Sequence, residues 1–282
     1  MRRTVERVVK AVVAPVGTFS VRRALPERQR HSVGPWVFLD HFGPYRAAAG
    51  DGVGAHPHAG IETVTYLLSG RNEHRDSAGN SGVVGPGGAQ WMTAGRGIVH
   101  AERAVVAAGA EAHVHGIQLW TSLPRLSKQM APRYQALAAA AIPEVRIGGA
   151  TVRVIAGELA GARGPAPVLM PLVLAHVRIE PGAHFEAAIE PAFEAAAYVI
   201  EGVARVDDRQ AATGHLVLWQ AEGEAVRIDN DGTAPLELML LGGEPAEGPL
   251  VFHGPFVMNN VEQVRAAEIA YRTGRMGTLE EA

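Results

Sequence analysis

The 282-residue sequence contains no cysteine, so it can form neither disulfides nor thiolate metal sites, and it has no cysteine nucleophile. Any metal ion must therefore be held by nitrogen and oxygen. Runs of basic residues are also missing, and the formal net charge of −3 argues against direct binding to nucleic acid. Long apolar runs are absent too: residues 168–177, for example, contain Pro171 and His176, so no membrane span is expected.

Residues 1–19 begin with basic side chains but lack the apolar core of a signal peptide, because Glu6 and Lys10 interrupt their apolar residues. Neither secretion nor membrane insertion is therefore expected. The predicted location is the cytoplasm.

Glycine and proline are plentiful, with 33 and 18 residues, and hydrophobic residues make up 47% of the chain against 20% charged. This composition is globular, and the many turn-forming residues favour a mostly β architecture. A chain of 282 residues is long enough for two domains that each bury a core.

Two pairs of potential metal ligands dominate the sequence: His56 with His58, and His100 with Glu102, each spaced i, i+2. Side chains two apart point to the same side of a β-strand, so each pair can aim at one point. A lone His-x-His pair is usually coincidental, but two such pairs in strand-like surroundings are not. Three imidazoles and one carboxylate suit a divalent first-row metal and leave two of six coordination positions open.

Both pairs have the surroundings of a strand. Residues 61–68 are rich in β-branched and aromatic side chains and lead to a turn at Gly70. Gly95 and Gly97 allow a tight turn before a short apolar run that ends at His100. The sequence therefore predicts one metal site built from strands, with His56, His58, His100 and Glu102 as ligands.

Another His-x-His pair, His113 and His115, has no carboxylate partner at similar spacing and is not expected to bind metal. Gln118 follows it in an otherwise apolar strand pattern. A buried amide needs a partner, so Gln118 either supports the site or contacts substrate, or else bonds to the backbone. His74 precedes Arg75 and Asp76; it is expected to be solvated or ion-paired at a strand end, with a fifth ligand as the less favoured alternative.

Asp40 and His41 end an apolar run, residues 36–42, and are interpreted as the polar end of a core strand rather than as catalytic groups. Short strands are expected over residues 4–23, where Pro15 and Gly17 break any long helix.

Residues 123–141 are rich in alanine and suit an irregular, partly helical connection between domains. The predicted domains are 1–140, which carries the metal site, and 141–282, which carries none. The clearest helix is predicted for residues 261–272.

The two halves also resemble each other at an offset of 128, which aligns His56 with His184. At this offset Glu186 replaces His58, Ile228 replaces His100 and Asn230 replaces Glu102. The second half therefore cannot hold the same metal, and His184 is expected to be structural. Duplicated barrels follow from the repeat.

Several long motifs resemble the pirin family of the cupin superfamily, and the resemblance covers essentially the whole chain. The motifs are residues 56–66, 74–77, 90–102, 118–120 and 254–259. The resemblance implies two cupin barrels in one chain, a bicupin, with short helices in the linker and at the C-terminus. It also implies a single metal, commonly iron, in the N-terminal barrel on residues that match His56, His58, His100 and Glu102. The chain departs from the family pattern at Ala59, where arginine is usual, and at Gly88, where an acidic residue is usual.

Some pirins are similar to quercetin dioxygenases, whereas animal members act as transcriptional cofactors. The first hypothesis is therefore a metal-dependent dioxygenase of the quercetinase type, which acts on a flavonol or similar enol-bearing aromatic with O2. Glu102 would be its base and Gln118 would orient the substrate. The alternative is a non-catalytic metal or redox sensor that binds a protein partner. Iron(II) is the expected metal, and Mn, Co, Ni, Cu and Zn also suit the ligands.

Overall fold

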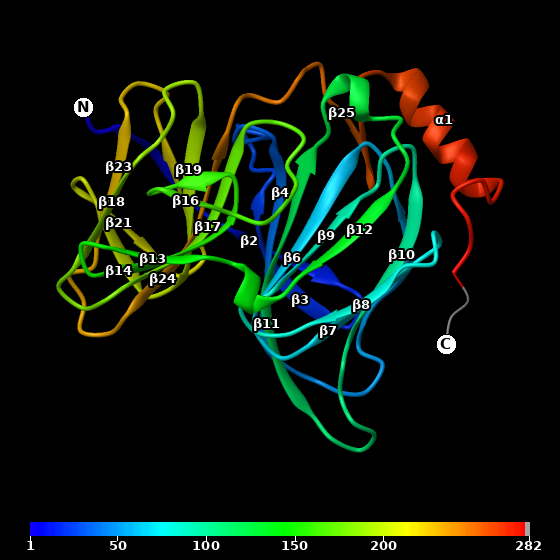
Figure 1. The fold of residues 1–282 in the computed structure, drawn as a ribbon, viewed down its shortest axis with the longest axis horizontal. Helices are drawn as coiled ribbons and strands as arrows, with labels where there is room; N and C mark the ends of the chain where they lie inside the picture. Colours follow the sequence, from blue (N-terminus) through cyan, green and yellow to red (C-terminus); the bar gives the residue numbers. More distant parts are fainter. Residues whose placement is uncertain (280–282) are drawn as a thin grey trace. The chain divides into compact units, whose positions relative to one another are not determined.

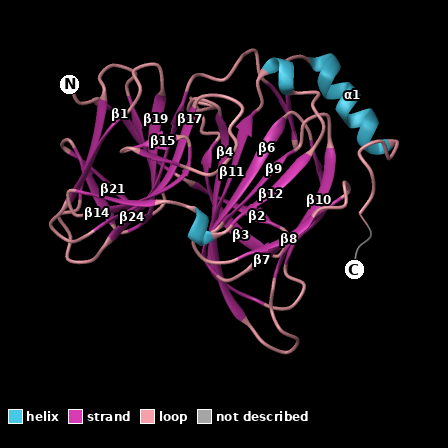
Figure 2. Cartoon of the chain, viewed as in Figure 1, coloured by secondary structure: helices cyan, strands magenta, loops and turns pink. Residues whose placement is uncertain are grey.

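The structure, a computed structural model, describes residues 1–279 and consists mainly of β-strands (Figures 1 and 2). Within these residues there is one α-helix, α1 (Val261–Arg272), and two short 3-10 helices, η1 (Arg125–Ser127) and η2 (Ala139–Ala141). The mostly β prediction, with short helices in the linker and at the C-terminus, is confirmed. No helix in this part of the chain is long and apolar enough to cross a membrane.

The chain divides into two compact units, and neither is continuous in sequence. Unit 1 comprises residues 1–12, 22–41 and 140–245, and unit 2 comprises residues 13–21, 42–139 and 246–282. The sequence changes unit at residues 139/140, close to the predicted linker. The segments at both ends of the chain, however, belong to the unit formed mainly by the other half. The division into domains 1–140 and 141–282 stays a prediction.

Unit 1 contains a seven-stranded and a four-stranded antiparallel sheet. The seven strands, in the order in which they pair, are β1 (Val5–Lys10), β22 (His215–Trp219), β19 (Glu194–Glu201), β24 (Leu236–Gly243), β17 (Leu172–Ile179), β14 (Ala150–Ala156) and β13 (Glu144–Ile147). The four strands are β18 (His184–Ala188), β23 (Ala225–Asp229), β20 (Val203–Val206) and β21 (Arg209–Ala212). A small hairpin is formed by β15 (Glu158–Leu159) and β16 (Ala162–Arg163).

Unit 2 is built around an equivalent pair of sheets. The seven strands of the larger sheet are β12 (Arg133–Leu137), β9 (Ala89–Thr93), β6 (Ile61–Ser69), β11 (Ala112–Ser122), β4 (Trp36–Ala47), β3 (Phe19–Leu25) and β2 (Val12–Val16). The four strands of the smaller sheet are β5 (Gly52–His58), β10 (Ile98–Ala104), β7 (Asn72–Asp76) and β8 (Ser81–Val84). A short hairpin joins β25 (Val251–His253) to β26 (Phe256–Met258). Strands β2, β3 and β4 contribute residues to both units.

The strand orders of the two units match position for position. Strands β18 to β24 of unit 1 take the places of β5 to β11 of unit 2, and β17, β14 and β13 take those of β4, β3 and β2. The N-terminal strand β1 fills in unit 1 the edge position that β12 fills in unit 2. The two units therefore share one topology, as the sequence repeat predicts.

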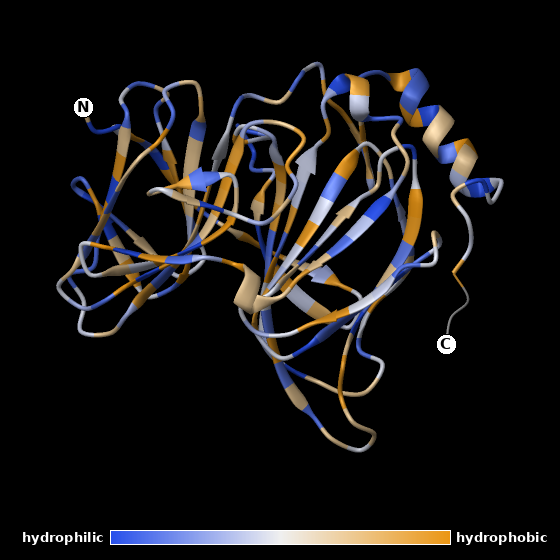
Figure 3. Cartoon of the chain, viewed as in Figure 1, coloured by the Kyte–Doolittle hydropathy of each residue, from blue (hydrophilic) through white to orange (hydrophobic). Residues whose placement is uncertain are grey.

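Hydropathy changes from residue to residue along many strands (Figure 3), as expected where successive side chains point to opposite faces. On β18, for example, Phe185 and Ala187 are buried in the apolar core of unit 1, whereas His184 and Glu186 are only half-buried. The binary pattern thus fixes which face of each strand meets the core.

Helix α1 begins and ends where the sequence predicts. The Asn260 side chain accepts a hydrogen bond from the backbone N–H of Gln263, which caps the first turn, and Gly274 (φ 72°) follows the last. The helix, red in Figure 1, packs against β25 and β26 and buries Val264 and Ala267.

The alanine-rich segment 123–141 is partly helical as predicted, with η1 and η2 inside it, but it also contains a strand that was not expected. Residues 133–137 form β12, which pairs with β9 along its whole length. Alanine favours helices only weakly compared with the hydrogen bonds that a free sheet edge offers, so tertiary pairing decides here.

Candidate metal centre

The two predicted ligand pairs lie on neighbouring strands. His56 and His58 are on β5, His100 and Glu102 are on β10, and His100 faces His56 across the antiparallel pair. Pro57 has no N–H to donate, but β5 is the edge strand of its sheet and tolerates it. Ligand atoms of the three histidines lie within 4.8 Å of one another, close enough to share one ion.

Hydrogen bonds orient the two β5 imidazoles. His56 Nδ1 lies 2.8 Å from the carbonyl oxygen of Gly54, and His58 Nδ1 lies 3.2 Å from that of Pro255. A carbonyl oxygen can only accept, so each Nδ1 carries the proton and donates it. This leaves the Nε2 lone pair of both rings available to a metal.

His100 is oriented by a chain of polar contacts. Its Nδ1 lies 3.3 Å from His74 Nδ1, and His74 Nε2 lies 3.1 Å from Asp76 Oδ2. With Asp76 ionised and both rings neutral, one proton arrangement fits: His100 donates to His74, and His74 donates to Asp76. Asp76 Oδ1 also accepts from the backbone N–H groups of Ala78 and Asn80.

The Nε2 atom of His100 is buried and has no hydrogen-bond partner within residues 1–279. A buried nitrogen lone pair without a partner is costly, and a metal ion shared with His56 and His58 would satisfy it. The donor set and its tautomers therefore fit a divalent metal.

The protonation states of the buried rings also fit. Burial, reinforced by the neighbouring His56, lowers the pKa of His58 to about 3. Burial and then His56, His58 and His74 hold the pKa of His100 well below its ordinary value. Both rings are neutral near pH 7, which is the form that binds metal.

Burial opposes ionisation of Asp76, but hydrogen bonds from His74 and Asn80 outweigh it and lower the pKa of this carboxyl. Asp76 therefore remains a carboxylate that can hold His74.

Glu102 is half-buried on β10, and one of its oxygens, Oε1, accepts from two side chains. Thr65 Oγ1 lies 2.6 Å away and Asn72 Nδ2 lies 3.2 Å away. The group of clustered ligand atoms contains the three histidines without Glu102. Metal ligation by Glu102 stays a prediction.

Gln118 lies opposite Thr65 on the β11–β6 pair, and its side-chain amide is 2.7 Å from Thr65 Oγ1. The threonine hydroxyl has one proton, and the carboxylate of Glu102 can only accept, so this proton goes to Glu102. The Gln118 amide then donates to Thr65, which requires only a half-turn of that amide. Gln118 therefore supports Glu102 through Thr65.

The family model for pirin matches residues 18–121, and that for the pirin C-terminal cupin domain matches residues 174–277. Pirin from Mus musculus is 35% identical over 261 residues, which cover 91% of this chain and 88% of that protein. The chain belongs to the pirin family. A pirin-like protein from Solanum lycopersicum is 35% identical over 259 residues, 91% of this chain and 87% of that protein.

The fold is also similar to a crystal structure of quercetin 2,3-dioxygenase from Acinetobacter baumannii, with a TM-score of 0.93 and 29% identity. The match covers 99% of this chain and 100% of that one. The predicted bicupin fold is confirmed by this likeness and by the two family models.

One departure from the pirin pattern lies next to His58. Ala59 is fully buried, against Val99 and Phe256 among others, so the position does not open onto solvent. The other departure, Gly88, lies in a turn where an added Cβ would come within 3.0 Å of the Leu137 carbonyl oxygen.

His74 is fully buried, so the expectation of a solvated strand end was wrong, whereas its pairing with Asp76 is confirmed. Sequence reasoning missed its contact with His100, although His74 and Asp76 are themselves an i, i+2 pair that projects to one face. Thr65, Asn72 and Pro255 carried no such signal.

The remaining candidates behave as structural residues. Asp40 forms two hydrogen bonds with Arg23, and His41 contacts the hydroxyl of Tyr198 at 3.0 Å. Both side chains make hydrogen bonds, as expected, but they lie inside β4, which continues past Gly43 and Pro44 to Ala47, so the expectation of a strand end was wrong. His113 is exposed and, like His115, stands outside the metal-ligand group.

Proposed function

We propose that this protein is a metal-dependent dioxygenase of the quercetinase type, which opens a flavonol or similar enol-bearing aromatic with O2. The observation that carries the proposal is the convergence of three histidines, all with Nε2 available and with that of His100 buried and unpartnered. The likeness to a quercetin 2,3-dioxygenase supports the choice of reaction.

Iron(II) is the metal we expect, held by His56, His58, His100 and Glu102, although Mn, Co, Ni, Cu and Zn suit the same atoms. When bound, the ion supplies a Lewis acid that stabilises a deprotonated substrate oxygen, because one carboxylate leaves a divalent ion with net positive charge.

Glu102 is the proposed base. Its Oε1 is occupied by Thr65 and Asn72, so the proton of the substrate hydroxyl would go to Oε2. The bonds to Oε1 fix the direction in which Oε2 points. Glu102 would act as this base only if it were not bound to the metal at the time.

Gln118 acts as a positioning residue in this scheme. Its amide donates to Thr65, which frees the threonine proton for Glu102. Trp120, two residues further along β11, stands edge-on to His58 with 4.8 Å between ring centroids. Gln118 and Trp120 project to the same face of β11, and the indole of Trp120 would give an aromatic substrate an apolar surface beside His58.

The test begins with anaerobic purification, loading with Fe(II) and elemental analysis, followed by oxygen consumption with quercetin and a panel of other flavonols and catechols. We expect oxygen uptake with at least one flavonol. Gln118→Glu introduces a second carboxylate beside Thr65 and should lower the rate while metal content is kept. A metal-loaded protein that consumes no oxygen with any flavonol refutes the proposal.

The alternative, a metal or redox sensor that binds a protein partner, would use the same histidines but needs no base. The hydrogen-bonded group of Thr65, Glu102 and Gln118 favours the enzyme. Metal-dependent capture of a defined partner by a protein without oxygen uptake would favour the sensor.

A further inference from the structure

Lys128 is a fully buried lysine just after η1, and the proposed chemistry does not use it. Its Nζ donates to the carbonyl oxygen of Gly60 (2.9 Å), the hydroxyl of Ser122 (2.9 Å) and the carbonyl oxygen of Val257 (2.8 Å). An ammonium group has three N–H donors, and each has an acceptor here. The acceptors come from three segments that are distant in sequence.

Two of these acceptors adjoin the metal centre. Gly60 lies two residues after His58, and Val257 lies two residues after Pro255, whose carbonyl oxygen orients the His58 ring. Between them, the backbone N–H of Val257 donates to the Ala59 carbonyl oxygen at 3.2 Å. Residues 58–60 and 255–257 are thus joined at three successive points.

The approach of these segments is close. Gly60 has φ +76°, and a Cβ added there would lie 2.1 Å from the Val257 carbonyl oxygen. The carbonyl oxygens of Gly60 and Val257 both accept from Nζ. Without the ammonium, the Gly60 oxygen would keep only the backbone N–H of Leu123 (3.1 Å), and the buried Val257 oxygen would lose this donor.

Keeping a charge at this position has a cost. Burial lowers the pKa of Lys128 to about 7, and the charge of Glu247 opposes that shift. A buried charge often contributes little to stability compared with an apolar residue of similar size, so stability alone is a weak reason for a lysine here.

We propose that Lys128 is a positioning residue of the metal centre: it fixes residues 255–257 against residues 58–60, and so aims His58 Nε2 at the metal. The C-terminal segment is then part of the metal site although it supplies no ligand. The inference rests on the proposed metal site but not on the dioxygenase reaction.

The test measures the dissociation constant of Co(II), a spectroscopic substitute for the native metal, by competition with a chelating dye. Lys128→Met removes the three donors and keeps an unbranched side chain that is one atom shorter. Loss of a group that orients a ligand typically weakens metal binding about 10- to 100-fold, and we expect this range together with a changed Co(II) visible spectrum. Lys10→Met is the matched control, because Lys10 is exposed and is the only other lysine.

The melting temperature of the metal-free variants separates positioning from simple stabilisation. A lower melting temperature with unchanged Co(II) affinity overturns the inference. If Lys128→Met does not fold, Ser122→Ala removes one acceptor, and a Co(II) dissociation constant equal to that of the unmodified protein overturns it instead. Tight Co(II) binding without oxygenase activity refutes the proposed reaction and leaves this inference standing.

Discussion

The two units have the same strand order but different chemistry on the inner face of their smaller sheet. In unit 2, β5 and β10 pair His56 with His100. In unit 1, the equivalent strands β18 and β23 pair Phe185 with Ile228, and both are fully buried in the apolar core. One topology thus supports either a ligand set or an apolar core, and a few inward-facing residues decide which.

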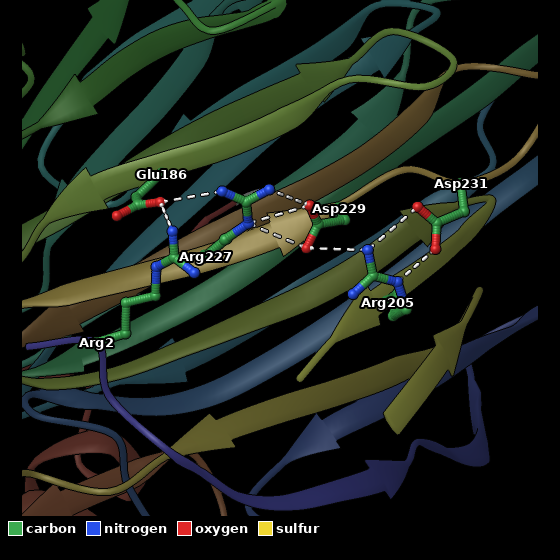
Figure 4. Close-up of polar contacts among 6 residues, drawn as sticks. All are labelled: Arg2, Glu186, Arg205, Arg227, Asp229 and Asp231. Atoms are coloured by element: carbon green, nitrogen blue, oxygen red, sulfur yellow. Dashed lines mark hydrogen bonds and ion pairs between the residues drawn. The ribbon is translucent and has the colours of Figure 1, made fainter. Parts of the chain in front are cut away.

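The charged residues of the unit 1 strands point to the opposite face. There Arg227 bonds to both Glu186 and Asp229, Arg2 adds to Glu186, and Arg205 pairs with Asp231 (Figure 4). The pairs of Arg2 with Glu186 and of Arg205 with Asp231 are exposed and contribute little stability each, whereas Asp229 is buried. The sheet face that carries histidines in unit 2 is apolar in unit 1, where the charged side chains lie on the opposite face.

This difference also corrects the alignment of the repeat. The offset of 128 aligns His56 with His184, and His184 pairs with Asp229 on the outer face. The pair that faces the core is Phe185 and Ile228. The position that corresponds to His56 is therefore Phe185, one residue later. A shift of one residue moves a side chain to the other face of a strand, which explains why His184 is remote from the core.

The sharpest way to break the comparison is to remove an inward histidine. His100→Ala should weaken metal binding by at least about 100-fold, more than the loss of a group that merely orients a ligand. His184→Ala in unit 1 is the matched control and should bind metal normally. Elemental analysis after dialysis measures both, and near-stoichiometric metal in His100→Ala would contradict the assignment.

Metal removal should affect the two units unequally. A ligand that binds only the folded state stabilises it by about 2.7 kcal/mol when its free concentration is 100 times the dissociation constant. Hydrogen exchange with and without a chelator should therefore show faster exchange in β5 and β10 of the metal-free protein, and little change in β18 and β23. Equal changes in both units would mean that the metal is not confined to unit 2.

Replacement of His74, which links His100 to Asp76, tests how His100 is oriented. In the unmodified protein His74 stacks on Tyr134, with 4.3 Å between centroids and 9° between planes. His74→Phe keeps a flat ring there but removes the polar contacts with His100 and Asp76. We expect metal affinity to fall about 10- to 100-fold with the fold intact. Affinity equal to that of the unmodified protein, measured by titration, would show that His100 needs no such support.

The smallest expected effect is on the pH dependence of stability, in a comparison of Glu62 with Glu194. These residues lie at equivalent positions of β6 and β19, each four residues before a tyrosine. Burial raises the pKa of Glu62, and hydrogen bonds from Thr93 and others only partly offset this. Between the ordinary pKa and the raised one, the folded state binds more protons than the unfolded state, so stability falls as the pH rises through this window.

Glu62→Gln removes that titration. The stability of the variant relative to the unmodified protein should rise by about 1 kcal/mol or less as the pH increases from 4.5 to 8. Glu194→Gln serves as the control, because Glu194 is a half-buried partner of Arg30. Urea unfolding across this range measures both variants, and identical pH slopes for Glu62→Gln and the unmodified protein would contradict the prediction.

Local patterns were enough to predict much of this structure. The i, i+2 spacing of His56 with His58, and of His100 with Glu102, predicted that the three histidines share one site, and the sequence pattern located α1 correctly. Strand β12 was missed because alanine-rich composition says nothing about an available sheet edge.

Long-range contacts could not be predicted from the sequence for a different reason. The Pro255 carbonyl that orients His58 is 197 residues away, and a backbone carbonyl carries no sequence signal. The same is true of the acceptors around Lys128, two of which are backbone oxygens. The residues that bind can be read from side-chain type, whereas the residues that hold them in place depend on the folded path of the chain.

The exchange of terminal segments between the units also sets an order in time. During synthesis, β1 leaves the ribosome long before β22, so Val5 cannot pair with Trp219 until residue 219 has been synthesised. The contact of His58 on β5 with the Pro255 carbonyl oxygen forms later still, because the two residues are 197 positions apart. Such distant pairings form slowly, and neither unit can be completed from the first half of the nascent chain. Because the proposed metal site needs Pro255 to orient His58, we expect it to be complete only after residue 255 has been synthesised.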